Sequence, residues 1–208
     1  MLYYQTIDAK TLELLKVLQS IPAFSNMRLA GGTSLALQTG HRKSIDLDFF
    51  GRLEADESTF PEAFTIFEKV TWIKKSANIN IFSINDIKVD FVNYVYPWLD
   101  ETKFEEGLRL AGLKDIAAMK LAAVTGRGTK KDFIDIYFLL QHFTLEEMLQ
   151  HYKNKYADGS DFLVLKSLTY FDDAEPEQEP VMLTNISWQA VKQTILTKHS
   201  AYLQSLKP

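Results

Sequence analysis

The chain of 208 residues contains no cysteine, which excludes a disulfide framework, a thiolate metal site and a cysteine nucleophile. It contains no apolar run near the roughly 20 residues that a membrane-spanning helix needs. Residues 1–10 also lack the basic and apolar segments of a secretory signal. We therefore expect a soluble, cytoplasmic protein without a membrane partner.

An excess of positive charge is also missing. The 23 Lys and Arg residues face 27 Asp and Glu residues, and the net charge of −4 indicates no global attraction for nucleic acid. The charges are nevertheless uneven, because basic residues gather between positions 114 and 131 and acidic residues between positions 172 and 179. The basic region can meet phosphate, although an ordinary solvated face explains the same pattern.

Hydrophobic residues make up 46% of the chain, enough for a substantial core. Their spacing predicts two parts. The first part is residues 1–110, where helices and strands alternate; the predicted elements are helices 7–18, 33–38 and 58–70 and strands 28–30, 45–50, 79–84 and 87–95. Thr6 is the expected N-cap of the first helix, and Asn85-Asp86 is the expected hairpin turn. This order predicts an α/β (α+β) fold in which helices flank a mixed sheet.

The second part, residues 111–208, is predicted to be a helical subdomain packed on that core. The predicted helices are 113–124, 131–141, 144–156, 161–171 and 188–206, with a loop at 172–180. Thr144 and Glu147 have the spacing of a capping box, and Ser187 is the expected cap of the last helix.

Two aspartates, Asp46 and Asp48, stand two residues apart in an apolar segment that reads as a buried strand. Because residues i and i+2 of a strand share a face, their carboxylates are expected to project together and to repel each other unless a cation binds. Asp90 lies in a second strand of the same kind. Three converging carboxylates suit Mg²⁺, which prefers oxygen ligands and completes its shell with water and substrate phosphates. The alternative is an edge strand whose carboxylates lie in water.

A glycine pair, Gly31-Gly32, stands before the helix that Thr33 and Ser34 open. Glycine lets the backbone approach a ligand closely, and the free N–H groups of a helix N-terminus favour phosphate. Alone, the glycine pair is more typical of a tight turn than of a phosphate site.

Together, these motifs resemble the DNA polymerase β-type nucleotidyltransferases. The segments GGTSLALQTGHRKSIDLDFF, VDFVNY and DIAAMKLAAVTGRGTKKDFIDIYFLL are similar, more narrowly, to the AbiEii/AbiGii toxin family. These are toxins of type IV toxin–antitoxin and phage-abortive systems. The similarity covers residues 29–140 and implies the nucleotidyltransferase core with a helical C-terminal part.

The resemblance implies roles by position. Asp46, Asp48 and Asp90 would hold Mg²⁺ or Mn²⁺ and act in catalysis, and the triphosphate would be cradled by the four residues Gly31, Gly32, Thr33 and Ser34. Lys120 would contact nucleotide phosphate, and Asp135 would orient that lysine or act as a base. Arg127 is seven residues after Lys120, so one helical face could carry both toward a phosphate. Surface charge is the alternative for both cations, and an ion pair with Lys131 or Lys120 is the alternative for Asp135.

The implied function is a metal-dependent enzyme that transfers a nucleoside monophosphate from an NTP to an acceptor hydroxyl and releases pyrophosphate. The resemblance implies RNA as the acceptor, in particular tRNA 3′ ends, and a separately encoded antitoxin as a partner. One alternative is a catalytically reduced nucleotide-binding or interaction module of the same fold. Another is a phosphatase with Asp46 as nucleophile, although Phe49 and Phe50 then replace the small or hydroxyl residues that usually follow.

Overall fold

The computed structural model describes residues 1–53 and 58–207, and the chain forms two compact units. The first, here called the sheet unit, consists of Met1–Tyr96 and Thr102–Ala111. The second, the helical unit, consists of Pro97–Glu101 and Gly112–Pro208.

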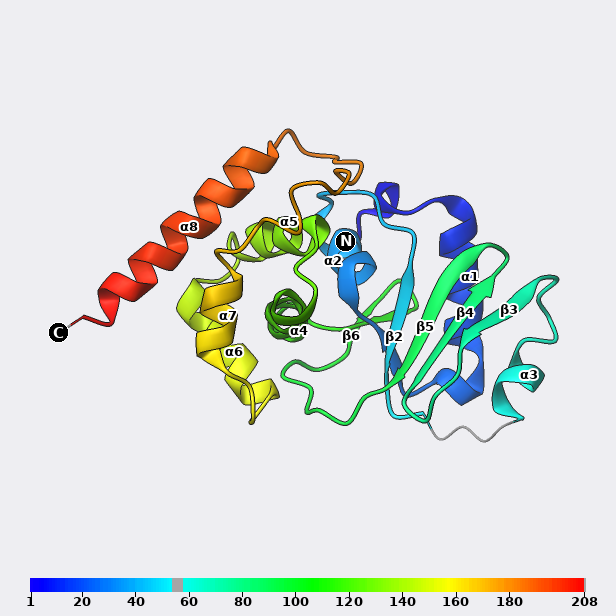
Figure 1. Cartoon of the computed structure of the whole chain (residues 1–208). Helices are drawn as coiled ribbons and strands as arrows, with labels where there is room; N and C mark the ends of the chain where they lie inside the picture. The colour runs from blue at the N-terminus through cyan, green and yellow to red at the C-terminus, as the bar shows by residue number, and fades with distance from the viewer. Residues whose placement is uncertain (54–57, 208) are drawn as a thin grey trace. The chain divides into compact units, whose positions relative to one another are not determined.

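The sheet unit contains, among the described residues, a seven-stranded sheet in the order β3-β4-β5-β2-β1-β7-β6 (Figure 1). The pairs β2–β5 and β1–β7 are parallel and the other neighbours are antiparallel, so the sheet is mixed, as predicted. The strands are β1 (Met27–Leu29), β2 (Leu47–Gly51), β3 (Val70–Lys74), β4 (Ile79–Ile84), β5 (Ile87–Asn93), β6 (Lys103–Glu105) and β7 (Leu108–Leu110).

The helical segments of this unit are η1 (Tyr4–Thr6), α1 (Ala9–Ser20), η2 (Pro22–Phe24), α2 (Gly31–Thr39) and α3 (Thr59–Ala63). The predicted N-cap of α1 is wrong. Asp8 caps this helix by accepting a hydrogen bond from the Thr11 N–H at 2.8 Å, while the Thr6 hydroxyl donates to the Tyr3 carbonyl within η1. Gly40 ends α2 in the left-handed conformation, with φ of 72°, as expected for a helix C-terminus.

The two faces of the sheet differ in character. One face belongs to the hydrophobic core, where leucines of α1 form a cluster with Phe49, Val89 and Phe91. The alternate residues of the same strands point to the opposite face, and these include Asp48 and Asp90. Both aspartates are half-buried. The acidic residues therefore lie on the face of the sheet that α1 does not cover.

The predicted helix 58–70 is wrong over its second half. Helix α3 ends at Ala63, and Val70–Lys74 forms strand β3, which pairs antiparallel with β4. Phe60 and Phe64 have helical spacing and are both buried, but the segment beyond them contains Val70, Trp72 and Ile73. β-Branched and aromatic side chains favour a pleated strand, and here β4 provides the pairing partner.

The predicted hairpin turn between β4 and β5 is confirmed. Asn85 and Asp86 have φ of 50° and 67°, the left-handed pair that a tight two-residue turn requires. A second hairpin, β6–β7, is absent from the sequence prediction. It turns at Glu106-Gly107, both with positive φ, and β7 joins the sheet by pairing Leu110 with Leu29 of β1.

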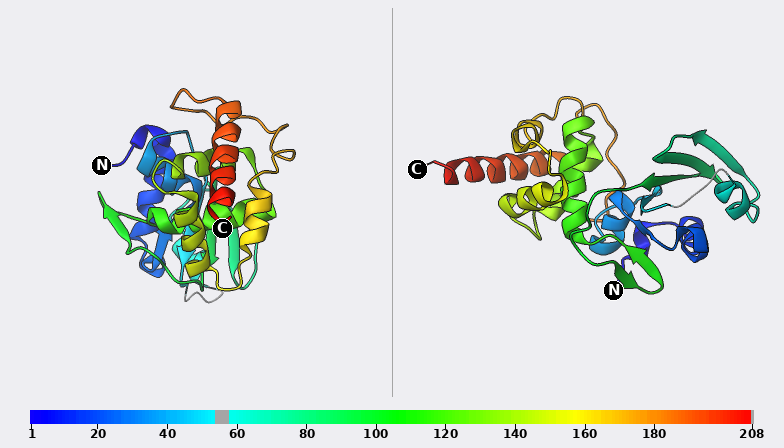
Figure 2. Two further views of the ribbon diagram at one scale, coloured as in Figure 1. Left: turned by 90° about the vertical axis from the view of Figure 1, so that its left-hand side faces the viewer. Right: turned by 90° about the horizontal axis from the view of Figure 1, so that it is seen from below.

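The helical unit contains α4 (Leu113–Gly126), α5 (Lys130–Leu139), α6 (Leu145–Lys155), α7 (Asp161–Ser167) and α8 (Trp188–Ser205). The capping box at Thr144 is confirmed: its hydroxyl accepts from the Glu147 N–H, and the Glu147 carboxylate accepts from the Thr144 N–H. Ser187 caps α8, which runs as one unbroken helix (Figure 2). Within the described residues, no helix combines the length and hydropathy needed to cross a membrane. The predicted fold class, helices around a mixed sheet followed by helices, is confirmed.

Candidate active site

Asp48 and Asp90 are direct neighbours in the sheet. They are Cα partners on the parallel strands β2 and β5, so their side chains lie side by side on the same face. The prediction that Asp46 lies in this strand is wrong, because β2 begins at Leu47 and Ile45 is exposed rather than buried. The loop before β2 therefore carries Asp46, and the sheet itself carries the other two carboxylates.

The N-terminal turn of α2 adjoins Asp48. Gly31 has φ of +63°, and a Cβ atom placed on it would collide with the Asp48 carboxylate. The Ala30 N–H also donates to the Asp48 carbonyl at 2.8 Å. Glycine is thus required at position 31 for two reasons, the left-handed backbone and the close approach of a carboxylate. The predicted glycine-led turn and the predicted acidic strand are in contact.

The Thr33 and Ser34 hydroxyls are both buried and both engaged within the protein. Thr33 Oγ1 donates to the Asp46 carbonyl and lies 2.8 Å from the Ser44 hydroxyl, while Ser34 Oγ accepts from the Gln38 side chain at 3.2 Å. Thr33 consequently fixes the backbone at Asp46 to helix α2.

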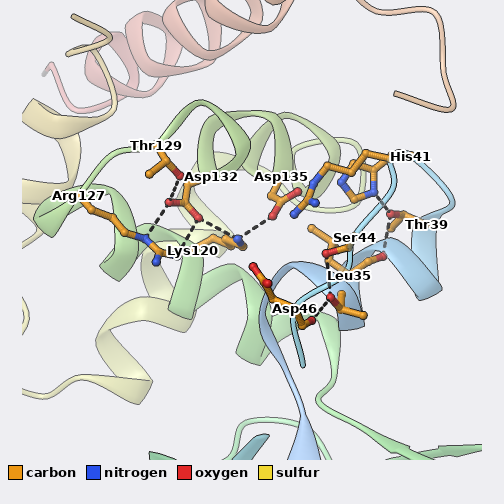
Figure 3. A network of polar contacts seen from close by, with 12 residues as sticks. Leu35, Thr39, His41, Ser44, Asp46, Lys120, Arg127, Thr129, Asp132 and Asp135 are labelled. Atoms are coloured by element: carbon orange, nitrogen blue, oxygen red, sulfur yellow. Dashed lines mark hydrogen bonds and ion pairs between the residues drawn. The ribbon is translucent and has the colours of Figure 1, made fainter. Parts of the chain in front are cut away.

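The turn between α2 and β2 is also held by polar contacts. His41 is fully buried, and its Nδ1 lies 2.6 Å from the Thr39 hydroxyl (Figure 3). The Ser44 N–H donates to the Thr6 carbonyl at 2.9 Å. These contacts fix the segment that leads into Asp46.

Asp90 already has a cationic neighbour. Lys88 Nζ lies 2.6 Å from Asp90 Oδ1, and the Lys88 side chain is 44% exposed. An ion pair this exposed contributes little to stability, of the order of 0–1 kcal/mol at most. It nevertheless relieves part of the repulsion between the neighbouring Asp48 and Asp90.

The carboxylates of the sheet unit suit a divalent metal by their chemistry. Two neighbouring, half-buried carboxylates provide hard oxygen ligands, and Mg²⁺ is commonly held by one or two carboxylates while water and substrate phosphates complete its shell. In residues 1–53 and 58–207, no three acidic or histidine side chains gather closely enough to hold one ion by themselves. The three-carboxylate site stays a prediction.

Lys120 of α4 and two aspartates of α5 form a buried cluster in the helical unit (Figure 3). Lys120 Nζ lies 2.8 Å from Asp132 Oδ1 and 2.6 Å from Asp135 Oδ2. The Lys120 side chain is 7% exposed and both aspartates are 0% exposed. The ion pair between Asp135 and Lys120, one of the two interpretations that the sequence left open, is thus present.

Arg127 and Thr129 complete the cluster around Asp132. Arg127 Nε lies 3.1 Å from Asp132 Oδ2, and the Thr129 hydroxyl donates to the same oxygen at 2.5 Å. Burial raises the pKa of Asp132, but the charges of Lys120 and Arg127 outweigh it and hold this pKa below its ordinary value. Asp132 is therefore an ionised anchor for both predicted phosphate-binding cations.

Asp132 was not among the predicted site residues, although its spacing of three from Asp135 places both on one helical face. A second buried pair was also missed. Lys155 Nζ lies 2.6 Å from Asp115 Oδ1, with both side chains fully buried, and it donates to the Pro97 carbonyl at 2.7 Å. No sequence signal links residues 40 positions apart. This pair ties the segment 97–101 to the helical unit.

The sheet unit also has a cavity of about 380 Å³ between α3 and β3. Its lining is mainly aromatic and includes Phe60, Phe64 and Trp72. None of the predicted site residues lines it.

Comparison with known proteins identifies relatives over nearly the whole chain. Residues 13–205 match the family model described as nucleotidyl transferase AbiEii toxin, type IV TA system. An uncharacterized protein from Aquifex aeolicus, aq_aa25, is 36% identical over 211 residues, which cover 93% of this chain and 96% of that protein.

Solved structures share the fold at lower identity. MenT4, the nucleotidyltransferase toxin Rv2826c of Mycobacterium tuberculosis, superposes with a TM-score of 0.62 at 17% identity, covering 96% of this chain and 82% of that one. JHP933 of Helicobacter pylori gives a TM-score of 0.59 at 17% identity, covering 96% and 94%. At this identity, the two structures establish a shared fold.

Proposed function

The chain belongs to the AbiEii family of nucleotidyl transferase toxins, and on that premise we propose that this nucleotidyltransferase moves a nucleoside monophosphate from an NTP to an RNA hydroxyl. The proposed acceptor is the 3′ end of RNA, tRNA in particular. A cytoplasmic type IV toxin–antitoxin system, with a separately encoded antitoxin, is the proposed setting.

One observation carries this proposal. Asp48 and Asp90 are registered neighbours on parallel strands, and the Asp48 carboxylate lies against Gly31 in the first turn of α2. A carboxylate pair beside the N–H groups of a helix N-terminus places cation-binding and phosphate-binding features together. A metal–nucleoside triphosphate complex has both kinds of group.

We propose Asp46, Asp48 and Asp90 as the ligands of Mg²⁺ or Mn²⁺. When bound, the metal would supply positive charge to neutralise the phosphates. The proposed triphosphate site is the first turn of α2, from Gly31 to Ser34. Because the Thr33 and Ser34 hydroxyls already have protein partners and the Ser34 N–H donates to the Ala30 carbonyl, the backbone N–H groups at positions 31–33 are the expected phosphate contacts.

In the proposed reaction, the oxygen of the acceptor hydroxyl forms a bond to the α-phosphorus, and the bond from that phosphorus to the bridging α–β oxygen breaks. Asp90 accepts the proton of the hydroxyl, and pyrophosphate leaves with the electron pair of the broken bond. The Lys88 ammonium lies 2.6 Å from Asp90 and can exchange this carboxylate for an incoming phosphate as its ion-pair partner.

We propose that the predicted helical subdomain, residues 111–208, also contributes to the reaction of the predicted core, residues 1–110. The proposed residues are two phosphate contacts, Lys120 and Arg127, and Asp135, which orients Lys120 or acts as a base. The support for them is the resemblance of the segment DIAAMKLAAVTGRGTKKDFIDIYFLL to the family. The contacts of Lys120 support its role as a phosphate contact, because Asp132 and Asp135 hold its ammonium in one position. A positioned cation costs less ordering entropy when it binds phosphate than a mobile one.

Radiolabel transfer from each of the four NTPs to total RNA and total protein, with Mg²⁺ and with EDTA, tests the proposal. We expect Mg²⁺-dependent labelling of RNA that Asp46→Asn/Asp48→Asn reduces by roughly 10²- to 10⁴-fold. The matched control is Asp158→Asn/Asp172→Asn, which changes the charge equally at two exposed positions. Equal labelling by the wild type and the Asp46/Asp48 variant would sink the assignment, and labelling of protein alone would replace RNA as the acceptor.

A further inference from the structure

Asp48 and Asp90, here called the acid pair, have different structural elements on their two sides in the sheet. On the β1 side, the chain passes from β1 through Ala30 into the first turn of α2, which contacts Asp48. On the other side, strands β5, β4 and β3 continue to the edge of the sheet. The proposed triphosphate site occupies the first side only.

The second side presents a row of residues in register with the acids. Lys74 of β3, Ile81 of β4 and Asp90 of β5 are successive Cα partners, and Asp48 of β2 follows. Registered partners share a face, so Lys74 lies on the acidic face of the sheet. Adjacent strands are about 4.8 Å apart, which places Lys74 about 10 Å from Asp90 along the sheet.

A second, polar row runs beside the first. Lys88 of β5, Ser83 of β4 and Thr71 of β3 are also successive partners on this face. Lys74, Lys88 and Thr71 are exposed, while Ile81 and Ser83 are half-buried. The face thus carries two lysines and two hydroxyls around one apolar side chain, and it begins at the residue proposed to accept the acceptor's proton.

We propose that this face of β3, β4 and β5 binds the sugar–phosphate backbone of a single-stranded RNA acceptor, with Lys74 and Lys88 as phosphate contacts. The inference rests on the proposed function and names the surface that presents the acceptor to Asp90. The charges are complementary to phosphates, since Lys88 lies on the same strand as Asp90 and Lys74 lies two strand spacings from it. The chain's net charge of −4 makes such a local contact necessary, because the protein as a whole does not attract RNA.

Lys88 has two partners in this scheme. Without RNA it neutralises Asp90, and the exposed ion pair breaks at little cost. With RNA it transfers to a phosphate, which leaves Asp90 free to accept the proton of the hydroxyl. Lys74, farther from the acids, holds the strand at a second point and so fixes its direction across the sheet.

The test measures binding of a short, 5′-fluorescein-labelled single-stranded RNA by anisotropy at several salt concentrations. We expect Lys74→Ala/Lys88→Ala to weaken binding roughly tenfold and to lower the slope of log K against log salt by about 1.4, since each phosphate contact contributes about 0.7 for single strands. Lys74→Arg/Lys88→Arg should keep both the affinity and the slope, because it keeps the charges.

The matched control is Lys10→Ala/Lys16→Ala. It removes the same charge from exposed positions on α1, the helix that packs on the core face of the sheet. Affinity and salt slope of this control should equal those of the wild type. Equal losses in both double variants, or no loss in the Lys74/Lys88 variant, would overturn the proposal, as would absence of RNA binding by the wild type.

The proposed function is tested separately by nucleotide transfer. Wild-type protein that labels RNA, together with a Lys74/Lys88 variant that binds RNA normally, would refute the binding face and leave the function intact. Wild-type protein that labels no acceptor would refute the function itself. Urea unfolding of each variant at neutral pH verifies that the substitutions leave the fold unchanged.

Discussion

The chain contains two clusters of aspartates that differ in what neutralises them. In the sheet unit, Asp48 and Asp90 are half-buried, and Asp90 forms an ion pair with Lys88, whose side chain is 44% exposed. In the helical unit, Asp132 and Asp135 are completely buried around Lys120. The same residue types therefore have different surroundings: the first cluster can exchange its cation for a ligand, whereas in the second the two aspartates hold the Lys120 ammonium in a buried position.

The largest expected effect on stability follows from removing the shared cation of the helical unit. Lys120→Met removes the ammonium that two fully buried aspartates share, and we expect it to lower the free energy of unfolding by roughly 3–5 kcal/mol. Urea unfolding followed by circular dichroism measures this change. Lys198→Met, at an exposed position of α8, is the control and should change stability by less than about 0.5 kcal/mol. A similar small change for Lys120→Met would show that the cluster is open to solvent.

A smaller effect is expected where the sheet unit depends on one buried hydroxyl. Thr33→Val keeps the shape of the side chain but leaves the Asp46 carbonyl and the Ser44 hydroxyl without their partner. Loss of such a buried hydrogen bond should cost about 1–3 kcal/mol. Thr197→Val on the exposed side of α8 is the matched control. If both variants unfold at the same urea concentration, the Thr33 hydroxyl does not hold the segment before β2.

The pH dependence of stability separates the two clusters further. The pKa of Asp132 is held below its ordinary value, so its ionised form stabilises the fold above about pH 4, and that stabilisation is lost as the pH falls through the lowered pKa. We expect Asp132→Asn to be less stable than the wild type at neutral pH and the difference to shrink below about pH 4. Unfolding curves at a series of pH values measure it. A difference independent of pH would contradict the ionised state of Asp132.

Among the charged side chains of the buried cluster, Arg127 should contribute least to the free energy of unfolding. Its side chain is 63% exposed, so solvent screens its attraction for Asp132, and Arg127→Ala should cost no more than about 1 kcal/mol. Nucleotide transfer by this variant then tests whether Arg127 also contacts phosphate. A fall in activity much larger than the change in stability supports that role, and unchanged activity argues against it.

The acid pair of the sheet unit should matter least for stability. Asp48→Asn/Asp90→Asn removes the repulsion between the two carboxylates together with the exposed Lys88–Asp90 ion pair, and we expect a change in the free energy of unfolding within about 0.5 kcal/mol. The same variant should lose nucleotide transfer. A destabilisation as large as that of Lys120→Met would contradict the claim that the aspartates of the sheet unit, unlike those of the helical unit, contribute little to stability.

Local signals in the sequence predicted many of these elements because their causes are local. Asn85-Asp86 adopts left-handed φ angles in a tight turn, and Thr144 and Glu147 cap a helix within one turn. Strand β7 has only three residues and depends on its pairing with β1. Such a strand has no periodicity of its own, because tertiary pairing determines it.

In the candidate site too, tertiary structure determines contacts that local sequence patterns do not reveal. The spacing of Asp46 and Asp48 indicated a cation site, and the register of β2 and β5 brings Asp48 beside Asp90. The burial of Lys120 between Asp132 and Asp135 depends on how α4 and α5 pack, which residue spacing does not determine. For the same reason, Lys74 gave no signal: only the register across β3, β4 and β5 places it on the acidic face.

The most direct test of the central claim is metal–nucleotide binding by the acid pair. Mn²⁺ binding can be followed by electron paramagnetic resonance with a non-hydrolysable NTP analogue, for the wild type, Asp48→Asn/Asp90→Asn and Asp158→Asn/Asp172→Asn. We predict that Mn²⁺ binds to the wild type and to the Asp158/Asp172 control, and that the Asp48/Asp90 variant, although folded, does not bind it. Equal Mn²⁺ binding by all three proteins would contradict the account.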